Sequence, residues 1–194
     1  MTIKLWGKMD NKKTISPEQY YQDVSLKILN FSKDVIDKVE KILLTEYQFD
    51  SNKRLFIIGN GGSAAIAEHI ATDLIKRCKV QAHTLSNNSL ATALTNDYKH
   101  ENGFLQWLKM YNFTENDFLI AISSSGKSEN VLNAIQYAES IGSYTLSIFG
   151  MNGVKTTSNI DKNIYLHIPS DNYGVVELTT EIFLHGIVES LVIE

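Results

Sequence analysis

Short apolar runs alternate with helical stretches along most of the chain from residue 54 onward. The runs at 54–59, 117–122 and 144–149 are the clearest, and their length and composition are typical of buried strands. Short apolar strands that alternate with helices predict a parallel sheet covered on both faces. We therefore expect an α/β fold in which ligands bind beyond the carboxyl ends of the strands.

The other elements follow from the same pattern. Further strands are expected at 80–84 and 164–168. Helices are expected at 63–78, 88–98, 101–111, 129–141 and 175–192.

Ahead of the first strand, the pattern predicts one long amphipathic helix over roughly 18–46, because apolar residues recur there at alternating spacings of three and four. Ser16-Pro17-Glu18 supplies an N-cap, a proline in the first turn and an acid that suits the helix dipole. We expect residues 1–46 to form a helical arm that packs on the core or on a neighbouring subunit. Residues 47–194 would then form the domain itself.

Composition narrows the class of protein. The 194 residues are 43% hydrophobic and 21% charged, as in one soluble globular domain. A net charge of −4 gives no pull toward nucleic acid or an anionic membrane, so neither is expected as a partner. The single cysteine, Cys78, excludes an internal disulfide framework and a cysteine-based zinc finger. Without a long apolar run or a signal-peptide pattern, we expect a cytoplasmic protein.

Two strand-to-helix turns are rich in small and hydroxyl-bearing residues. The first, residues 59–65, reads Gly-Asn-Gly-Gly-Ser-Ala-Ala, and its glycines let backbone N–H groups approach a ligand. It lacks the acidic residue that a dinucleotide site carries about 20 positions on, and it lacks the Gly-Lys-Ser/Thr ending of a Walker A loop. A tight turn that serves only helix packing explains it equally well.

The second turn, residues 123–128, reads Ser-Ser-Ser-Gly-Lys-Ser and directly follows a strand. Four hydroxyls, a glycine and a lysine at a helix N-terminus make a cradle for a phosphate monoester. A serine-capped helix start would need only one of the four serines. The sequence therefore favours a phosphate site at this turn.

Two helices each carry a histidine and a carboxylate on one face. His69 and Asp73 are four residues apart on the helix that leaves the first turn, and Glu181 and His185 are four apart on the last helix. Such pairs can bind a divalent metal or supply a general acid and base. For either pair alone, a solvated helix face is the simpler interpretation.

The other three histidines carry less information. His83 and His167 fall in expected strands and are interpreted as packing residues. His100 stands in a polar segment without an evident partner.

These segments together resemble the sugar isomerase (SIS) domain family. The resemblance rests on 59–65 followed by His69, on Asn96-Asp97 and on 121–131. Within that family the chain is most similar to the phosphoheptose isomerases, which interconvert sedoheptulose 7-phosphate and D-glycero-D-manno-heptose 7-phosphate. The resemblance implies a flavodoxin-like three-layer α/β/α sandwich, a homotetramer with active sites at subunit interfaces, and a bound zinc.

The resemblance also implies roles for individual residues. The serines that would hold the sugar phosphate are Ser123, Ser124, Ser125 and Ser128. The rest of the substrate site would comprise Asn60, Gly61, Gly62, Ser63, Asn96, Asp97 and Glu177. The implied metal ligands are His69, Asp73, Glu177 and His185, and the implied catalytic pair is Asp73 and His185.

The chain departs from the family pattern at two of these positions. Asp73 stands where the family has a glutamate, and Glu177 stands where it has a glutamine, in a segment that reads Val-Val-Glu-Leu instead of Arg-Ile-Gln-Glu. Helical spacing alone would pair Glu181 with His185, because eight residues of ideal helix span about 12 Å. The family position therefore requires Glu177 to lie at the irregular start of the last helix.

From these residues we expect an aldose–ketose isomerase that moves a proton through an enediolate, with Asp73 as base and His185 as acid. A metal, expected to be zinc, would polarise the substrate oxygens. Three alternatives stay open. They are an isomerase of another phosphosugar, a non-catalytic sugar-phosphate sensor or replication-initiator-binding protein, and an interaction protein with a vestigial pocket.

Overall fold

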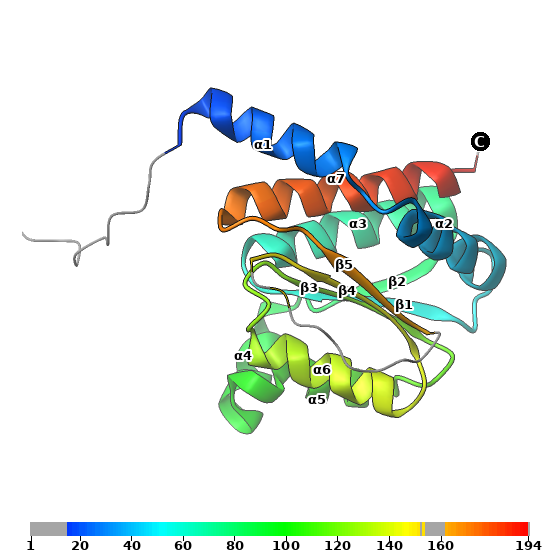
Figure 1. The fold of residues 1–194 in the computed structure, drawn as a ribbon. Helices are drawn as coiled ribbons and strands as arrows, with labels where there is room; N and C mark the ends of the chain where they lie inside the picture. Colours follow the sequence, from blue (N-terminus) through cyan, green and yellow to red (C-terminus); the bar gives the residue numbers. More distant parts are fainter. Residues whose placement is uncertain (1–14, 152, 154–161, 194) are drawn as a thin grey trace, which may run out of the picture.

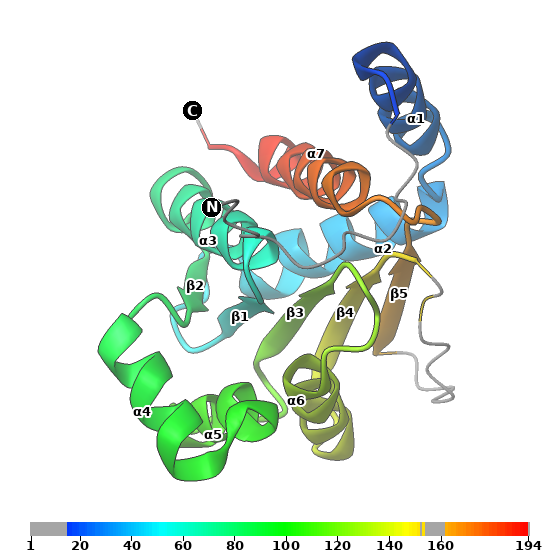
Figure 2. The same cartoon turned by 90° about the vertical axis from the view of Figure 1, so that its left-hand side faces the viewer.

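A computed structural model describes residues 15–151, 153 and 162–193. Five parallel strands form one sheet between two helical layers (Figure 1, Figure 2). The strands are β1 (Arg54–Gly59), β2 (Gln81–Thr84), β3 (Phe118–Ser123), β4 (Tyr144–Phe149) and β5 (Asn163–His167). The helices that follow β1 are α3 (Gly62–Cys78), α4 (Asn88–Tyr98), the 3-10 turn η2 (His100–Asn102), α5 (Gly103–Met110), α6 (Glu129–Ser140) and α7 (Tyr173–Leu191). The expected three-layer α/β sandwich is confirmed.

The strand order is β2-β1-β3-β4-β5, and each neighbouring pair is parallel. This is the flavodoxin-like order, in which the chain first builds outward from β1 to one edge and then returns to build the other side. The direction changes between β1 and β3, which pair in register up to Gly59 and Ile122. The two turns singled out by the sequence therefore leave the sheet side by side, at the point where such sheets bind ligands.

The core lies on both faces of the sheet. Leu55 and Ile57 of β1 face the layer made by α3 and α7, whereas Phe56 and Ile58 face the layer made by α4, α5 and α6. All four side chains are almost fully buried. A strand with no solvent-facing side reads as a continuous apolar run, which is why the pattern alone predicted a parallel sheet.

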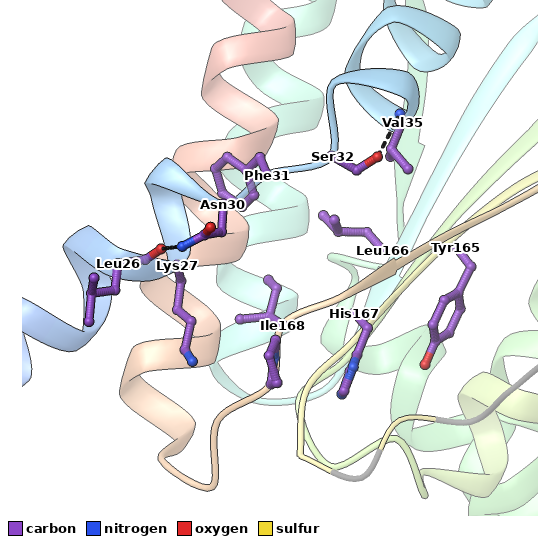
Figure 3. Close-up of a pocket in the computed structure, with 11 residues that line it drawn as sticks. Leu26, Lys27, Asn30, Phe31, Ser32, Val35, Tyr165, Leu166, His167 and Ile168 are labelled. Carbon is purple, nitrogen blue, oxygen red and sulfur yellow. Dashed lines mark hydrogen bonds between the residues drawn. The ribbon is translucent and has the colours of Figure 1, made fainter.

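The single helix expected over 18–46 is wrong. The structure has α1 (Pro17–Leu29), then α2 (Lys33–Ile42), which continues into the π-helical turn η1 (Leu43–Tyr47). Between α1 and α2, Ser32 Oγ accepts a hydrogen bond from the Val35 N–H and caps a new helix start, as Figure 3 shows beside a groove of about 610 Å³. The apolar spacing runs on through the break because Phe31 packs edge-on against Phe183 of α7.

The two halves of this N-terminal region have different surroundings. The second half belongs to the core, because Val39, Ile42 and Tyr47 are buried among the residues of α3 and α7. The first half, α1, lies along α7 and is tied to its start by Tyr20, whose hydroxyl donates to the Gly174 carbonyl at 2.9 Å. Within the described ranges, no helix is long and apolar enough to cross a membrane.

An ion pair fastens the start of β1 to that of β3. The Asp117 carboxylate is 1% exposed and accepts from Arg54 Nε at 2.9 Å and from Arg54 Nη2 at 2.7 Å. It also accepts from the Thr114 backbone N–H at 2.7 Å. Both carboxylate oxygens are therefore used, which is the arrangement in which a buried charge is best compensated.

The substitution Asp117→Ala should lower the free energy of unfolding by about 2–4 kcal/mol, because it leaves the Arg54 guanidinium without its buried partner. Urea unfolding followed by circular dichroism measures this loss. The exposed pair of Lys33 and Asp37, with 81% and 54% of each side chain accessible, is the control. Asp37→Ala should change stability very little, and equal losses in the two variants would contradict the assignment.

Candidate functional site

Side chains join the two turns directly. Ser63, at the start of α3, and Ser124, after β3, place their hydroxyl oxygens 3.5 Å apart. The side-chain amides of Asn60 and Asn130 exchange two hydrogen bonds of 2.9 Å each. The residues that follow β1 and β3 thus form one continuous surface at the carboxyl edge of the sheet.

The serines of the second turn do not serve as caps of α6. Ser128 occupies the N-cap position, yet among the described residues it makes no side-chain capping bond. Its hydroxyl oxygen accepts instead from the Ser123 hydroxyl at 3.2 Å, and Ser125 Oγ accepts from the Lys127 N–H at 3.2 Å. A capped helix start therefore does not explain four serines. A cluster of hydroxyls at a helix N-terminus is suited to a phosphate.

Backbone geometry requires glycine at position 61 of the first turn, and Gly62 lies against a side chain of α7. Gly61 has φ of +56°, in the region that side chains other than glycine rarely adopt. A Cβ atom on Gly62 would lie 2.5 Å from Glu177 Oε2, so the α7 carboxylate rests directly on the backbone at the start of α3. That carboxylate already supplies negative charge to this helix terminus. A phosphate is therefore favoured at the serine turn, with the uncharged part of the ligand near Gly62.

Four ionisable side chains meet where α3 packs against α7. Glu181 Oε1 lies 3.4 Å from His69 Nδ1 and 3.9 Å from His185 Nε2. Asp73 Oδ2 faces the other ring nitrogen of each histidine, at 3.8 Å from His69 Nε2 and 4.0 Å from His185 Nδ1. Each imidazole therefore has one carboxylate at either nitrogen.

This donor set fits a divalent metal. The ligand atoms of His69, Glu181 and His185 all lie within 4.8 Å of one another. In a tetrahedral zinc site with bonds of about 2.0 Å, ligand atoms are about 3.3 Å apart, so only small side-chain movements are needed. Asp73 is then placed to accept from the remaining ring N–H groups, as carboxylates beside metal-bound histidines commonly do. Arg77 Nη1 lies 3.6 Å from Asp73 Oδ2 and 2.8 Å from Glu189 Oε1.

A cavity of about 390 Å³ connects this cluster with the first turn. Gly62 and Glu177 line one part of it, and His69 and Glu181 line another. A small molecule in this cavity could contact the glycine turn and the histidine–carboxylate cluster at once.

The structure brings most of the predicted site residues together but not all of them. It brings the residues of the two turns together, and it brings His69, Asp73 and His185 together. Glu177 is different, because α7 is regular from Tyr173 onward and the condition of an irregular helix start is not met. Glu177 lies outside the metal-compatible group among the described residues, and Glu181, one turn later, takes its place beside the histidines. Asn96 and Asp97 are exposed on α4, where the Asn96 amide donates to Asp97 Oδ1.

Two features of the site were not evident from sequence patterns. Asn130 is 3% exposed and bonds Asn60 across the two turns, which only the pairing of β1 with β3 makes possible. His100 lies 3.4 Å from the Asn130 amide, so it has the partner that the sequence did not suggest. His83 behaves as the packing residue expected, because it stacks on Phe56 and burial lowers the pKa of its imidazole.

Comparisons with known proteins show the family and the fold of this chain. A model of the SIS domain matches residues 19–150. The phosphoheptose isomerase of Helicobacter pylori (strain HPAG1) is 36% identical over 142 residues, covering 70% of this chain and 72% of the relative. That of Aliarcobacter butzleri (strain RM4018) is 30% identical over 173 residues, covering 86% and 89%. The structure of phosphoheptose isomerase from Neisseria gonorrhoeae matches with a TM-score of 0.79 at 21% identity, covering 90% of this chain and 96% of that one.

The fold and the two linked turns define a flavodoxin-like α/β protein whose glycine turn and serine turn meet where the strand order reverses. The chain belongs to the SIS domain family and, within it, to the phosphoheptose isomerases. It is therefore a member of a family of isomerase enzymes.

Zinc affinity distinguishes Glu181 from Glu177 as a metal ligand. We expect Glu181→Gln to weaken zinc binding at least about tenfold, because the carboxylate between the two imidazoles loses its charge. Glu177→Gln should leave zinc affinity nearly unchanged. Competition with a chromophoric chelator measures both constants, and Glu68→Gln, on an exposed position of α3, is the control. A large loss with Glu177→Gln and none with Glu181→Gln would instead favour the ligand set implied by the family.

Proposed function

We propose that the protein isomerises sedoheptulose 7-phosphate to D-glycero-D-manno-heptose 7-phosphate. The relatives named phosphoheptose isomerase support this substrate, and the serine turn, which meets the glycine turn at the carboxyl edge of the sheet, supports a phosphorylated ligand. The observation that carries the proposal is the cavity shared by Gly62, His69 and Glu181, because it lets one molecule contact the glycine turn and reach titratable groups.

In this proposal the serine turn binds and orients the substrate. Ser123, Ser124, Ser125 and Ser128 hold the phosphate, and Asn60, Gly61 and Ser63 line the neighbouring part of the sugar site. Binding energy from the phosphate then positions the reacting carbons, which converts a slow encounter into a reaction between fixed groups. We assign Asn96, Asp97 and Glu177 to the sugar hydroxyls, as the family resemblance implies.

The proton is moved by the pair at the α3–α7 contact. Asp73 Oδ2 takes it from the carbon beside the carbonyl, and His185, whose Nδ1 lies 4.0 Å away, delivers a proton to the enediolate. The roles exchange in the reverse direction. The Arg77 guanidinium, 3.6 Å from Asp73 Oδ2, places a positive charge beside that carboxylate.

The metal in this proposal is zinc, held by His69, Glu181 and His185 with Asp73 beside them. When bound, it would polarise the carbonyl and hydroxyl oxygens of the substrate. His69 has no other part in the reaction, so its role would be to bind the metal.

We also propose a cytoplasmic homotetramer. Exposed apolar side chains on α1, among them Tyr21, Leu26 and Leu29, support contact with a further copy of the chain. Substrate contacts from a neighbouring subunit would then add to those made by the serine turn and the glycine turn.

Proton NMR of sedoheptulose 7-phosphate in D₂O, with purified protein and added zinc or a chelator, examines the function directly. We expect the signals of an aldose 7-phosphate to appear with zinc and to be lost with the chelator. Deuterium at C2 would show that the transferred proton exchanges with solvent. If neither product nor exchange appears, even with zinc, heptose isomerisation is ruled out. The result would then point to another phosphosugar or to a sensor.

The substitution Asp73→Asn should abolish turnover, at least about a hundredfold, because an amide cannot accept the proton. Binding of the sugar phosphate by calorimetry should survive, because the serine turn is untouched. Glu68→Gln on the same helix is the matched control and should retain turnover. An Asp73→Asn variant that still turns over would remove Asp73 from the reaction.

A further inference from the structure

The paired amides of Asn60 and Asn130 have two possible directions. In the cyclic pair each amide donates one N–H and accepts one, so turning both amides over exchanges nitrogen with oxygen and preserves both bonds. The pair alone therefore does not decide whether Asn60 presents an N–H or a carbonyl oxygen to a ligand. Groups outside the pair must decide it.

Two such groups contact Asn130. The backbone N–H of Val131 donates to Asn130 Oδ1 at 3.0 Å and also to the Ser128 carbonyl at 3.0 Å, so it favours the oxygen at that position. On the opposite side, His100 Nε2 lies 3.4 Å from Asn130 Nδ2, which carries the N–H not used by Asn60. Since Asn130 Nδ2 is a donor in both contacts, His100 Nε2 must accept, and its imidazole carries the proton on Nδ1.

The three side chains also line one cavity. It measures about 210 Å³ and lies beside Gly61, on the α4–α5 side of the glycine turn. Asn130 is almost completely buried, so its unused N–H would be costly without an acceptor. His100 supplies that acceptor from η2, a short turn on the rim of the same cavity.

We infer that His100 is a positioning residue that, through Asn130, sets the direction of the Asn60 amide in the sugar-phosphate site. Asn60 has a second N–H that is not used by Asn130, and the network directs this donor, in preference to a carbonyl oxygen, toward the bound ligand. The inference rests on the proposed function only in identifying that ligand as a sugar phosphate.

A purely structural role of His100 can be distinguished from an orienting role, because a second hydrogen bond joins η2 to α6. Asn133 Nδ2 donates to the Glu101 carbonyl at 2.8 Å, without any contact to Asn60. Asn133→Ala loosens η2 as His100→Phe does, but it leaves the acceptor for Asn130 in place. The two variants therefore distinguish support of a loop from orientation of an amide.

The first experiment needs no substrate. A long-range ¹H–¹⁵N spectrum of the imidazoles should show His100 protonated on Nδ1 and bare on Nε2. The Asn60 side-chain amide signals should shift in His100→Phe and stay in place in Asn133→Ala. An Nε2–H tautomer, or an Asn60 amide that is insensitive to His100→Phe, would overturn the inference whatever the enzyme's substrate is.

The second experiment is kinetic. With sedoheptulose 7-phosphate, His100→Phe should raise KM roughly three- to tenfold with kcat nearly unchanged, as expected for one misdirected hydrogen bond. His100→Gln, which retains an acceptor, should restore KM, and Asn133→Ala should match the wild type. A rise in KM for Asn133→Ala equal to that for His100→Phe would overturn the inference. Wild-type protein without any turnover would overturn the proposed function alone, since the spectra still decide the direction of the amide.

Discussion

The pairing of β1 with β3 is the constraint on which the site depends. Because these strands are neighbours and end in register, the turn after Gly59 and the turn after Ser123 meet, although more than sixty residues separate them. The contacts between the two turns follow from this adjacency, including the Ser63–Ser124 contact and the Asn60–Asn130 pair. The Arg54–Asp117 ion pair fastens the opposite ends of the same two strands, so it stabilises the register from which the site is built.

The second requirement is the contact between α3 and α7. Each helix contributes one histidine and one carboxylate, and the four groups can interact only because the two helices pack along one face of the sheet. Buried apolar residues of both helices, such as Ile70 and Val188, hold that contact. The four ionisable groups are thus partly exposed to solvent, whereas the apolar residues of the same helix contact are buried in the core.

Local patterns in the sequence were sufficient for the sheet and for most of its helices, whose ends differ by at most two residues from those expected after residue 54. They failed where two signals competed. The apolar spacing continues across Phe31 and so predicted one helix. In the structure, however, Ser32 caps the start of a new helix. For the metal group, helical spacing indicated Glu181 and family resemblance indicated Glu177. The structure places Glu181 beside the histidines, and which of the two binds a metal stays a prediction. The partner of His100 could not have been predicted, because it depends on which strands are neighbours.

The helix α3 also fixes the spacing between two parts of the site. It begins at Gly62, beside the turns, and carries His69 seven residues later, so its rise places about 10 Å along the helix axis between the backbone of Gly62 and that of His69. That spacing is set by backbone hydrogen bonds and not by side chains, so it is rigid. Under the proposed function, a ligand that contacts both ends must match the length of two helical turns, so the pitch of an α-helix would select among sugar phosphates by the length of their carbon chain.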